Sequence, residues 1–124
     1  MRRVRPTAVL AALGGGALLA ACGGTAAPPA PPGSSPHRGH DLVVHYGCGA
    51  CHRIGGVAAA DGRVGPPLTG FAKRRYIVGR LPATPGNVAR WILDPDRIRP
   101  NTIMPDLGLT RRQARDVTAY LYGQ

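Results

Sequence analysis

The stretch CGACH at residues 48–52 decides how the rest of this sequence is interpreted. It places two cysteines three positions apart, so both thiols face the same side of a helical turn, and His52 follows directly. The chain of 124 residues has three cysteines, and the third, Cys22, lies far upstream in a segment of different composition. The motif must therefore be explained by chemistry that needs one cysteine pair and an adjacent histidine.

Several kinds of site contain such a pair. A thioredoxin-like redox pair needs a strand followed by a helix, and no alternating strand pattern surrounds this motif. A structural zinc site needs a fourth ligand and a second pair, and no further cysteine exists. A structural disulfide across two residues is sterically awkward. The remaining interpretation is haem attachment: Cys48 and Cys51 add to the porphyrin vinyl groups and His52 binds the iron, which predicts one covalent haem c.

Iron held in this way normally takes a sixth ligand, commonly a methionine sulfur. Met104 is the only methionine besides the initiator, and Pro105 disfavours a helix there, so we expect an extended loop that crosses the far haem face. The alternative is a loop methionine that only covers apolar surface. His37, His40 and His45 precede the attachment motif on one short segment, and we expect them to be solvated.

A second motif, GPPL at residues 65–68, looks like the Gly-Pro-x-Leu element of a known family. With both motifs in this order and spacing, residues 38–124 resemble the class I cytochrome c family. The resemblance implies an all-α cytochrome c fold, a small helical domain wrapped around one covalent haem. It also implies that the Pro66 carbonyl accepts a hydrogen bond from the haem-ligating imidazole, and that Leu68 packs on the haem.

Local signals predict three helices. Apolar residues at core-facing intervals indicate a first helix over residues 39–46. A Thr-Pro pair at residues 84–85 can open a second helix, and the Asp-Pro pair at residues 94–95 ends it. A capping box at residues 110–113 opens the last helix. On that helix, the positions that resemble the family's haem contacts are Val117, Tyr120 and Leu121.

The resemblance also places Trp91 where the family often ties down a haem propionate. We expect Trp91 to pack in the core, with an indole N–H that can also reach a propionate. Its candidate companions are Tyr76, Arg74, Arg75 and Arg80, with no single arginine preferred. Arg53 and Lys73 are expected on a positive rim around the haem edge, which would steer the protein toward acidic partner surfaces.

The N-terminal part has a different character. Residues 1–21 are typical of an export signal, with a basic start and an apolar run too short and glycine-rich for a transmembrane helix. The run ends in LAAC at residues 19–22, which resembles a bacterial lipoprotein processing site and predicts lipidation of Cys22. An ordinary secretory signal is the alternative. Residues 22–36, with five prolines, predict a semi-stiff tether, and residues 37–124 the folded domain.

These features predict an electron carrier at a membrane surface. Without the signal, thirteen basic residues face six aspartates, a net charge of +7, and export argues against nucleic acid as a partner. No catalytic acid–base or nucleophilic constellation is present, so we expect one-electron cycling and no small-molecule substrate. The expected partners are a terminal oxidase, a quinol-oxidising complex or a dehydrogenase, met on the periplasmic face of a bacterial membrane. The alternatives are a haem-bearing anchoring subunit of such a complex and, if Met104 does not ligate, a gas-binding sensor.

Overall fold

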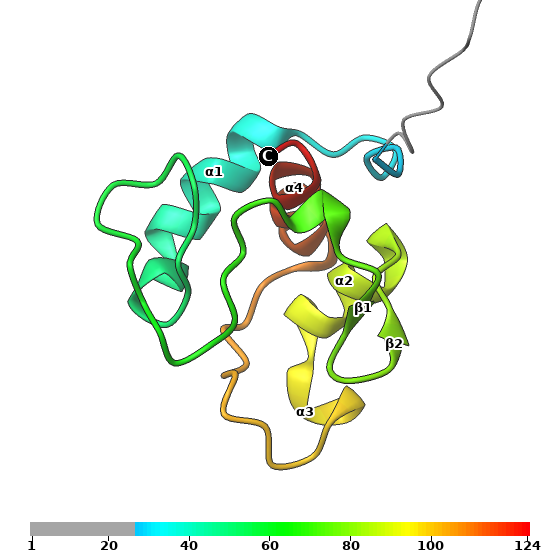
Figure 1. The fold of residues 1–124 in the computed structure, drawn as a ribbon. Helices are drawn as coiled ribbons and strands as arrows, with labels where there is room; N and C mark the ends of the chain where they lie inside the picture. The colour runs from blue at the N-terminus through cyan, green and yellow to red at the C-terminus, as the bar shows by residue number, and fades with distance from the viewer. Residues whose placement is uncertain (1–26) are drawn as a thin grey trace, which may run out of the picture.

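The computed structural model describes residues 27–124, so the predictions for the export signal and for Cys22 lie outside the described residues. Short helices are joined by long loops (Figure 1). In chain order the elements are α1 (Pro36–His45), η1 (Cys48–Ala50), η2 (Phe71–Lys73), β1 (Tyr76–Ile77), β2 (Leu81–Pro82), α2 (Pro85–Leu93), α3 (Pro95–Ile98) and α4 (Arg111–Tyr122). The predicted all-α class is confirmed, since the only sheet in this part of the chain is a two-stranded ribbon. Within residues 27–124, no helix has the length and apolarity needed to cross a bilayer.

Helix α1 begins one turn earlier than the sequence predicts. The Ser35 hydroxyl caps it by accepting a hydrogen bond from the Arg38 N–H, and Pro36 is the first helical residue. Serine followed by proline is the same kind of start signal as the Thr-Pro pair that opens α2. The predicted start at Gly39 is therefore wrong, because this signal sits at the end of a proline-rich run whose composition favours a tether.

Caps set the bounds of the other helices. Thr84 caps α2 as predicted. Asp94 both ends α2 and caps the single turn of α3, so Pro95 starts a new helix where the sequence analysis expected only an end. At α4 the predicted capping box is confirmed: the Thr110 hydroxyl accepts from the Gln113 N–H, and the Thr110 N–H donates to the Gln113 side chain at 2.8 Å.

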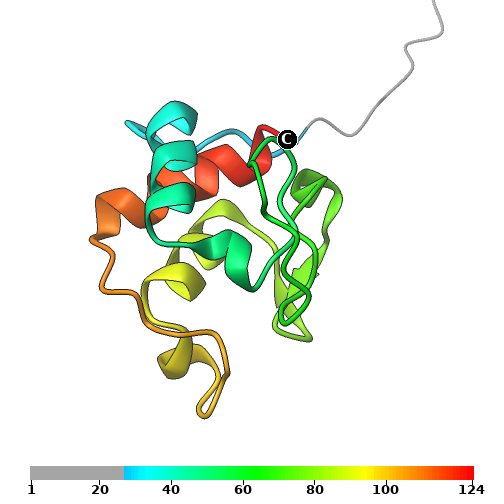
Figure 2. The same ribbon diagram turned by 90° about the vertical axis from the view of Figure 1, so that its left-hand side faces the viewer.

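Helices α1 and α4 cross and pack against each other, and α4 also packs against α2 (Figures 1 and 2). The crossing is close because Gly39 of α1 faces the α4 backbone. A Cβ at Gly39 would lie 2.0 Å from the Asp116 carbonyl oxygen and 2.8 Å from the Tyr120 Cβ. One face of α4, formed by Ala114, Val117 and Leu121, is apolar and buried.

Gly39→Ala is expected to destabilise the protein by about 2–3 kcal/mol, since the added methyl group meets α4 backbone that cannot move without opening the crossing. Gly86→Ala in the first turn of α2 is the matched control, because a Cβ there has nothing within 4 Å. Replacing an unstrained helical glycine should stabilise by about 0.5–1 kcal/mol. Urea unfolding followed by circular dichroism measures both variants, and equal stabilities would contradict the close crossing.

A buried carboxylate joins the start of α1 to α4. Asp116 is 2% exposed. Its oxygens accept hydrogen bonds from Arg38 Nε at 2.8 Å, from Arg38 Nη2 at 2.9 Å and from the Ser35 N–H at 2.7 Å. The Arg38 guanidinium holds the pKa of this carboxyl below its ordinary value, against the opposing effect of desolvation. Because Arg38 Nη2 also donates to the Gly33 carbonyl at 3.3 Å, the chain is fastened to the domain from Gly33 onward.

This ion pair makes stability depend on pH. Because folding lowers the pKa of Asp116, its charged form stabilises the folded state above the unfolded pKa of about 4, and the stabilisation is lost as pH falls through the lower folded value. Asp116→Asn should therefore lower stability at neutral pH and weaken the loss of stability in acid. Urea unfolding over a pH series measures this, with the exposed Asp61→Asn as control. An unchanged acid dependence in Asp116→Asn would contradict the assignment.

Candidate functional site

The cysteine motif lies on a 3₁₀ turn directly after α1. Gly47 enters the turn in the left-handed region, with φ of 65°. The N–H groups of Cys51 and His52 both donate to the Cys48 carbonyl, at 3.3 and 3.0 Å. In a 3₁₀ turn residues three apart eclipse, so Cys48 and Cys51 lie on one side. Both are half-buried free thiols in the described part of the chain, and burial raises the pKa of the Cys48 thiol.

A backbone carbonyl orients His52. Its Nδ1 donates to the Pro66 carbonyl oxygen at 2.8 Å, since a carbonyl can only accept, and Nε2 therefore keeps its lone pair for a ligand. The family resemblance implies this same hydrogen bond. Gly65 makes room for it, because a Cβ there would lie 2.2 Å from His52 Cε1 and 2.6 Å from Nδ1. The Gly65 N–H donates to the Cys51 carbonyl at 2.8 Å, so the two motifs hold each other in place.

The thiol and imidazole groups line a cavity of about 500 Å³. Its other walls come from the end of α1, the 64–68 segment, the turn between β1 and β2, α2, the 99–107 loop and Leu121 of α4. Met104 lines the cavity from the 99–107 loop, where the chain has neither helix nor strand, as the sequence predicted. Figure 1 shows this loop, drawn in orange, as it leaves α3 and returns toward α4.

The residues of the cavity fit the haem that the sequence predicts. Its lining combines two thiols, an imidazole with a free Nε2 and one thioether, set among mainly apolar side chains. Its volume lies within the range of roughly 300–1,000 Å³ that is typical of ligand and cofactor pockets. Within residues 27–124, no group of three or more His, Cys or acidic side chains is placed to hold a bare metal ion. Cys48 and Cys51 would attach the haem, and His52 and Met104 would ligate its iron.

Not every predicted contact residue lines this cavity. Leu68, Trp91 and Leu121 line it, from the 64–68 segment, α2 and α4. Val117 and Tyr120 are not among the lining residues. Val117 is buried in the core of the domain, and the Tyr120 hydroxyl donates to the Gly55 carbonyl at 2.9 Å, so both support the α4 packing beside the cavity.

The three histidines before the motif stay away from the cavity, as expected. His37 and His45 are exposed. His40 packs edge-on against the Tyr120 ring, with 5.4 Å between the ring centroids. None of the three is therefore a rival to Met104 as an iron ligand.

Two arginines line the cavity, and only one of them was predicted from the sequence. Arg74 is the predicted one, and its Nη2 donates to the Pro67 carbonyl at 2.6 Å. Arg99 is the other, brought there by the loop that carries Met104. The remaining cationic candidates are exposed and lie outside the cavity lining: Arg53, Lys73, Arg75 and Arg80.

Comparison with known proteins identifies the family of this chain. Residues 37–123 match the Cytochrome c family. Over 75 residues, 60% of this chain, the sequence is 31% identical to Cytochrome c oxidase subunit 2 of Alkalihalophilus pseudofirmus. The matched part is 21% of that relative, so the chain spans about a fifth of its length. Because the family match covers most of the chain and includes the CGACH motif, this chain belongs to the cytochrome c family of haem-based electron-transfer proteins.

Proposed function

We propose that this protein is a membrane-anchored electron carrier with one covalent haem c, attached through Cys48 and Cys51 and ligated by His52 and Met104. The observation that carries the proposal is that two thiols, an oriented imidazole and a thioether line one cavity. When bound, the haem supplies one-electron exchange between ferric and ferrous iron.

The protein would hold His52 and Met104, the proposed iron ligands, by contacts of its own. The Pro66 carbonyl orients His52, and the Met104 N–H donates to the Thr102 hydroxyl at 3.3 Å. Ligands that stay bound in both the ferric and the ferrous state keep the reorganisation energy of electron transfer small. The apolar walls of the cavity and the soft thioether both favour the reduced state.

The proposed location is the periplasmic face of a bacterial membrane, with acyl chains on Cys22. The LAAC stretch at residues 19–22 and the proline-rich residues after it support this proposal. Cys22→Ser is expected to move the protein from the membrane fraction to the soluble fraction and to remove the acyl mass. Intact-mass spectrometry and fractionation measure these changes, and a natural protein without acyl mass would contradict the anchor.

The proposed partner is a terminal oxidase. Its support is the similarity to part of the Cytochrome c oxidase subunit 2 of Alkalihalophilus pseudofirmus, together with the basic charge of the domain. The reduced protein is expected to be oxidised by oxidase-containing membranes at a rate that saturates with its concentration and falls as salt rises. No oxidation above that of oxidase-free membranes would contradict this partner.

The same similarity favours a second candidate, a haem-bearing subunit fixed to an oxidase. Purification in mild detergent separates the two functions. An independent carrier should leave the oxidase on a salt wash, whereas a fixed subunit should stay with it in constant proportion.

A further inference from the structure

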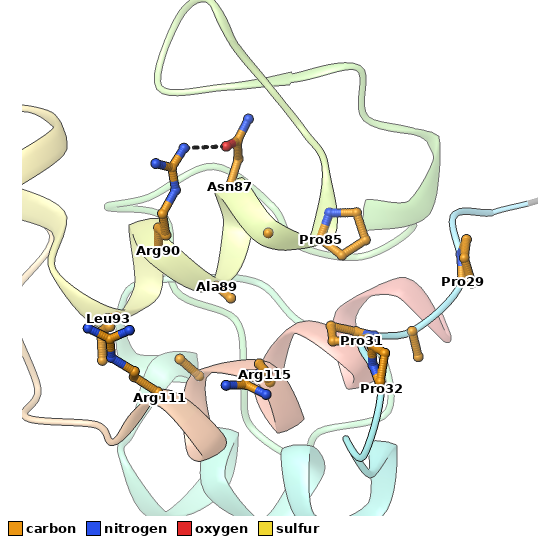
Figure 3. Close-up of a pocket in the computed structure, with 13 residues that line it drawn as sticks. Pro29, Pro31, Pro32, Pro85, Asn87, Ala89, Arg90, Leu93, Arg111 and Arg115 are labelled. Atoms are coloured by element: carbon orange, nitrogen blue, oxygen red, sulfur yellow. Dashed lines mark hydrogen bonds between the residues drawn. The ribbon is translucent and has the colours of Figure 1, made fainter.

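A second hollow lies on the side of α2 that faces away from the haem cavity. It has a volume of about 790 Å³ and is lined by residues 29–32, α2 and α4 (Figure 3). The α2 residues that line it include Pro85, Ala89, Arg90 and Leu93, whereas those that line the haem cavity are Val88, Trp91 and Ile92. At helical spacing these two sets point to opposite sides of α2. The hollow and the haem cavity therefore lie on opposite sides of α2.

The hollow combines an apolar floor with an uncompensated positive rim. Arg90, Arg111 and Arg115 line it, and neither Asp nor Glu is among the lining residues. All three arginines are exposed, and neither ion pair of residues 27–124 includes one of them. Arg111 and Arg115 stand one turn apart on α4, so their guanidinium groups lie on the same helix face. Such a surface suits an anionic amphiphile, since guanidinium groups bind phosphate in a bidentate manner.

The course of the chain brings this surface close to the proposed anchor. Pro31 and Pro32 stand at one end of the hollow, and Leu93 and Arg111 at the other (Figure 3). The Asp116–Arg38 pair and the bond from Arg38 to the Gly33 carbonyl fasten the chain just after these prolines.

The stretch of chain between Cys22 and the hollow is short. Pro29, which also lines the hollow, follows Cys22 by seven residues. Even a fully extended stretch of seven residues reaches only about 25 Å. A lipid on Cys22 would therefore keep Pro29, at one end of the hollow, within about that distance of the bilayer surface.

We propose that this hollow binds the headgroups of anionic phospholipids, so that the haem cavity opens away from the membrane and toward its partners. The inference rests on the proposed anchor at Cys22 for its location, while the chemistry of the surface does not depend on the anchor. Each arginine near an anionic surface raises the binding constant for that surface about fivefold. Losing Arg111 and Arg115 should thus lower the equilibrium constant for the docked orientation about thirtyfold.

Hydrogen exchange of the full-length, haem-loaded protein on lipid vesicles tests this orientation. Vesicles of phosphatidylcholine alone are compared with an equal mixture of phosphatidylcholine and phosphatidylglycerol. We expect amides of residues 86–93 and 111–115 to be protected only on the mixture, and the protection to be lost in R111Q/R115Q. The matched control is R63Q/R97Q, which removes the same charge from exposed positions outside both cavities and should keep the protection.

Several results would overturn the proposal. These are equal protection on both kinds of vesicle, no protection on either, or loss of protection in both double variants. Protection that grows with protein concentration in the absence of vesicles would instead make the surface an interface between copies of the chain. Intact mass reports the lipid on Cys22 independently, so failure of the anchor and failure of this surface are distinguishable.

Discussion

Replacing Met104 with alanine is expected to lower the reduction potential of the haem-loaded protein by roughly 0.1 V or more, within the range of about 0.8 V that axial ligands span. The reason is that a thioether is a soft ligand that favours ferrous iron, and its loss removes that preference. The weak red-edge band of the methionine–iron bond should disappear, and the ferrous form should gain carbon monoxide binding. Potentiometric titration and absorption spectra measure these changes.

Two further variants separate ligation from packing. Met104→His supplies another ligand, so it should again exclude carbon monoxide while the potential stays low. Pro100→Ala alters the same loop at an exposed residue outside the cavity lining, and it should leave the spectrum unchanged. If Met104→Ala kept the red-edge band and the potential, the methionine would not be a ligand, and a gas-binding function would become the better interpretation.

Gly65→Ala is expected to destabilise the haem-loaded protein by about 2–3 kcal/mol and to reduce the yield of loaded protein. The new Cβ would lie 2.2 Å from His52 Cε1, so the imidazole must turn away and lose its bond to the Pro66 carbonyl. An imidazole without that acceptor is less basic and less firmly oriented, which should also shift the potential. Thermal unfolding and potentiometry of the purified variant measure the two effects.

Pro66→Ala is the control for this prediction. The His52 partner is the backbone carbonyl of Pro66, which the substitution keeps, so the hydrogen bond and the potential should change little. Gly65→Ala with natural stability, potential and yield would contradict the close packing of glycine against the ligand.

The sequence predicts those elements whose start and end are both encoded locally. Helices α2 and α4 carry a capping residue at their first turn and an apolar face of the right period, and both were predictable. Helix α3 and the β1–β2 ribbon were not, because four residues and two pairs of residues are too short for a period to show. The Asp116–Arg38 pair joins residues 78 positions apart, and no local pattern reveals a contact of that range.

The candidate site also has residues that the sequence indicates and residues that it does not. The sequence alone singles out the attachment motif and Met104, because few residue types can perform the chemistry and the chain offers few of them, and the structure places all of them around one cavity. The wall of the cavity was less predictable. Arg99 lines the cavity from the 99–107 loop, whereas Tyr120 is not among the lining residues and its hydroxyl donates to the Gly55 carbonyl. Side chains that line a pocket through loop geometry leave no signal in sequence spacing.

Covalent haem attachment is tested most directly by absorption spectra of the oxidised and reduced protein, combined with acid–acetone extraction. If Cys48 and Cys51 hold the haem, it should remain with the precipitated protein, and the spectrum should be that of a low-spin c-type haem. The Cys48→Ser/Cys51→Ser variant should release any haem that it binds into the acetone phase. Haem extracted freely from the natural protein would contradict the attachment.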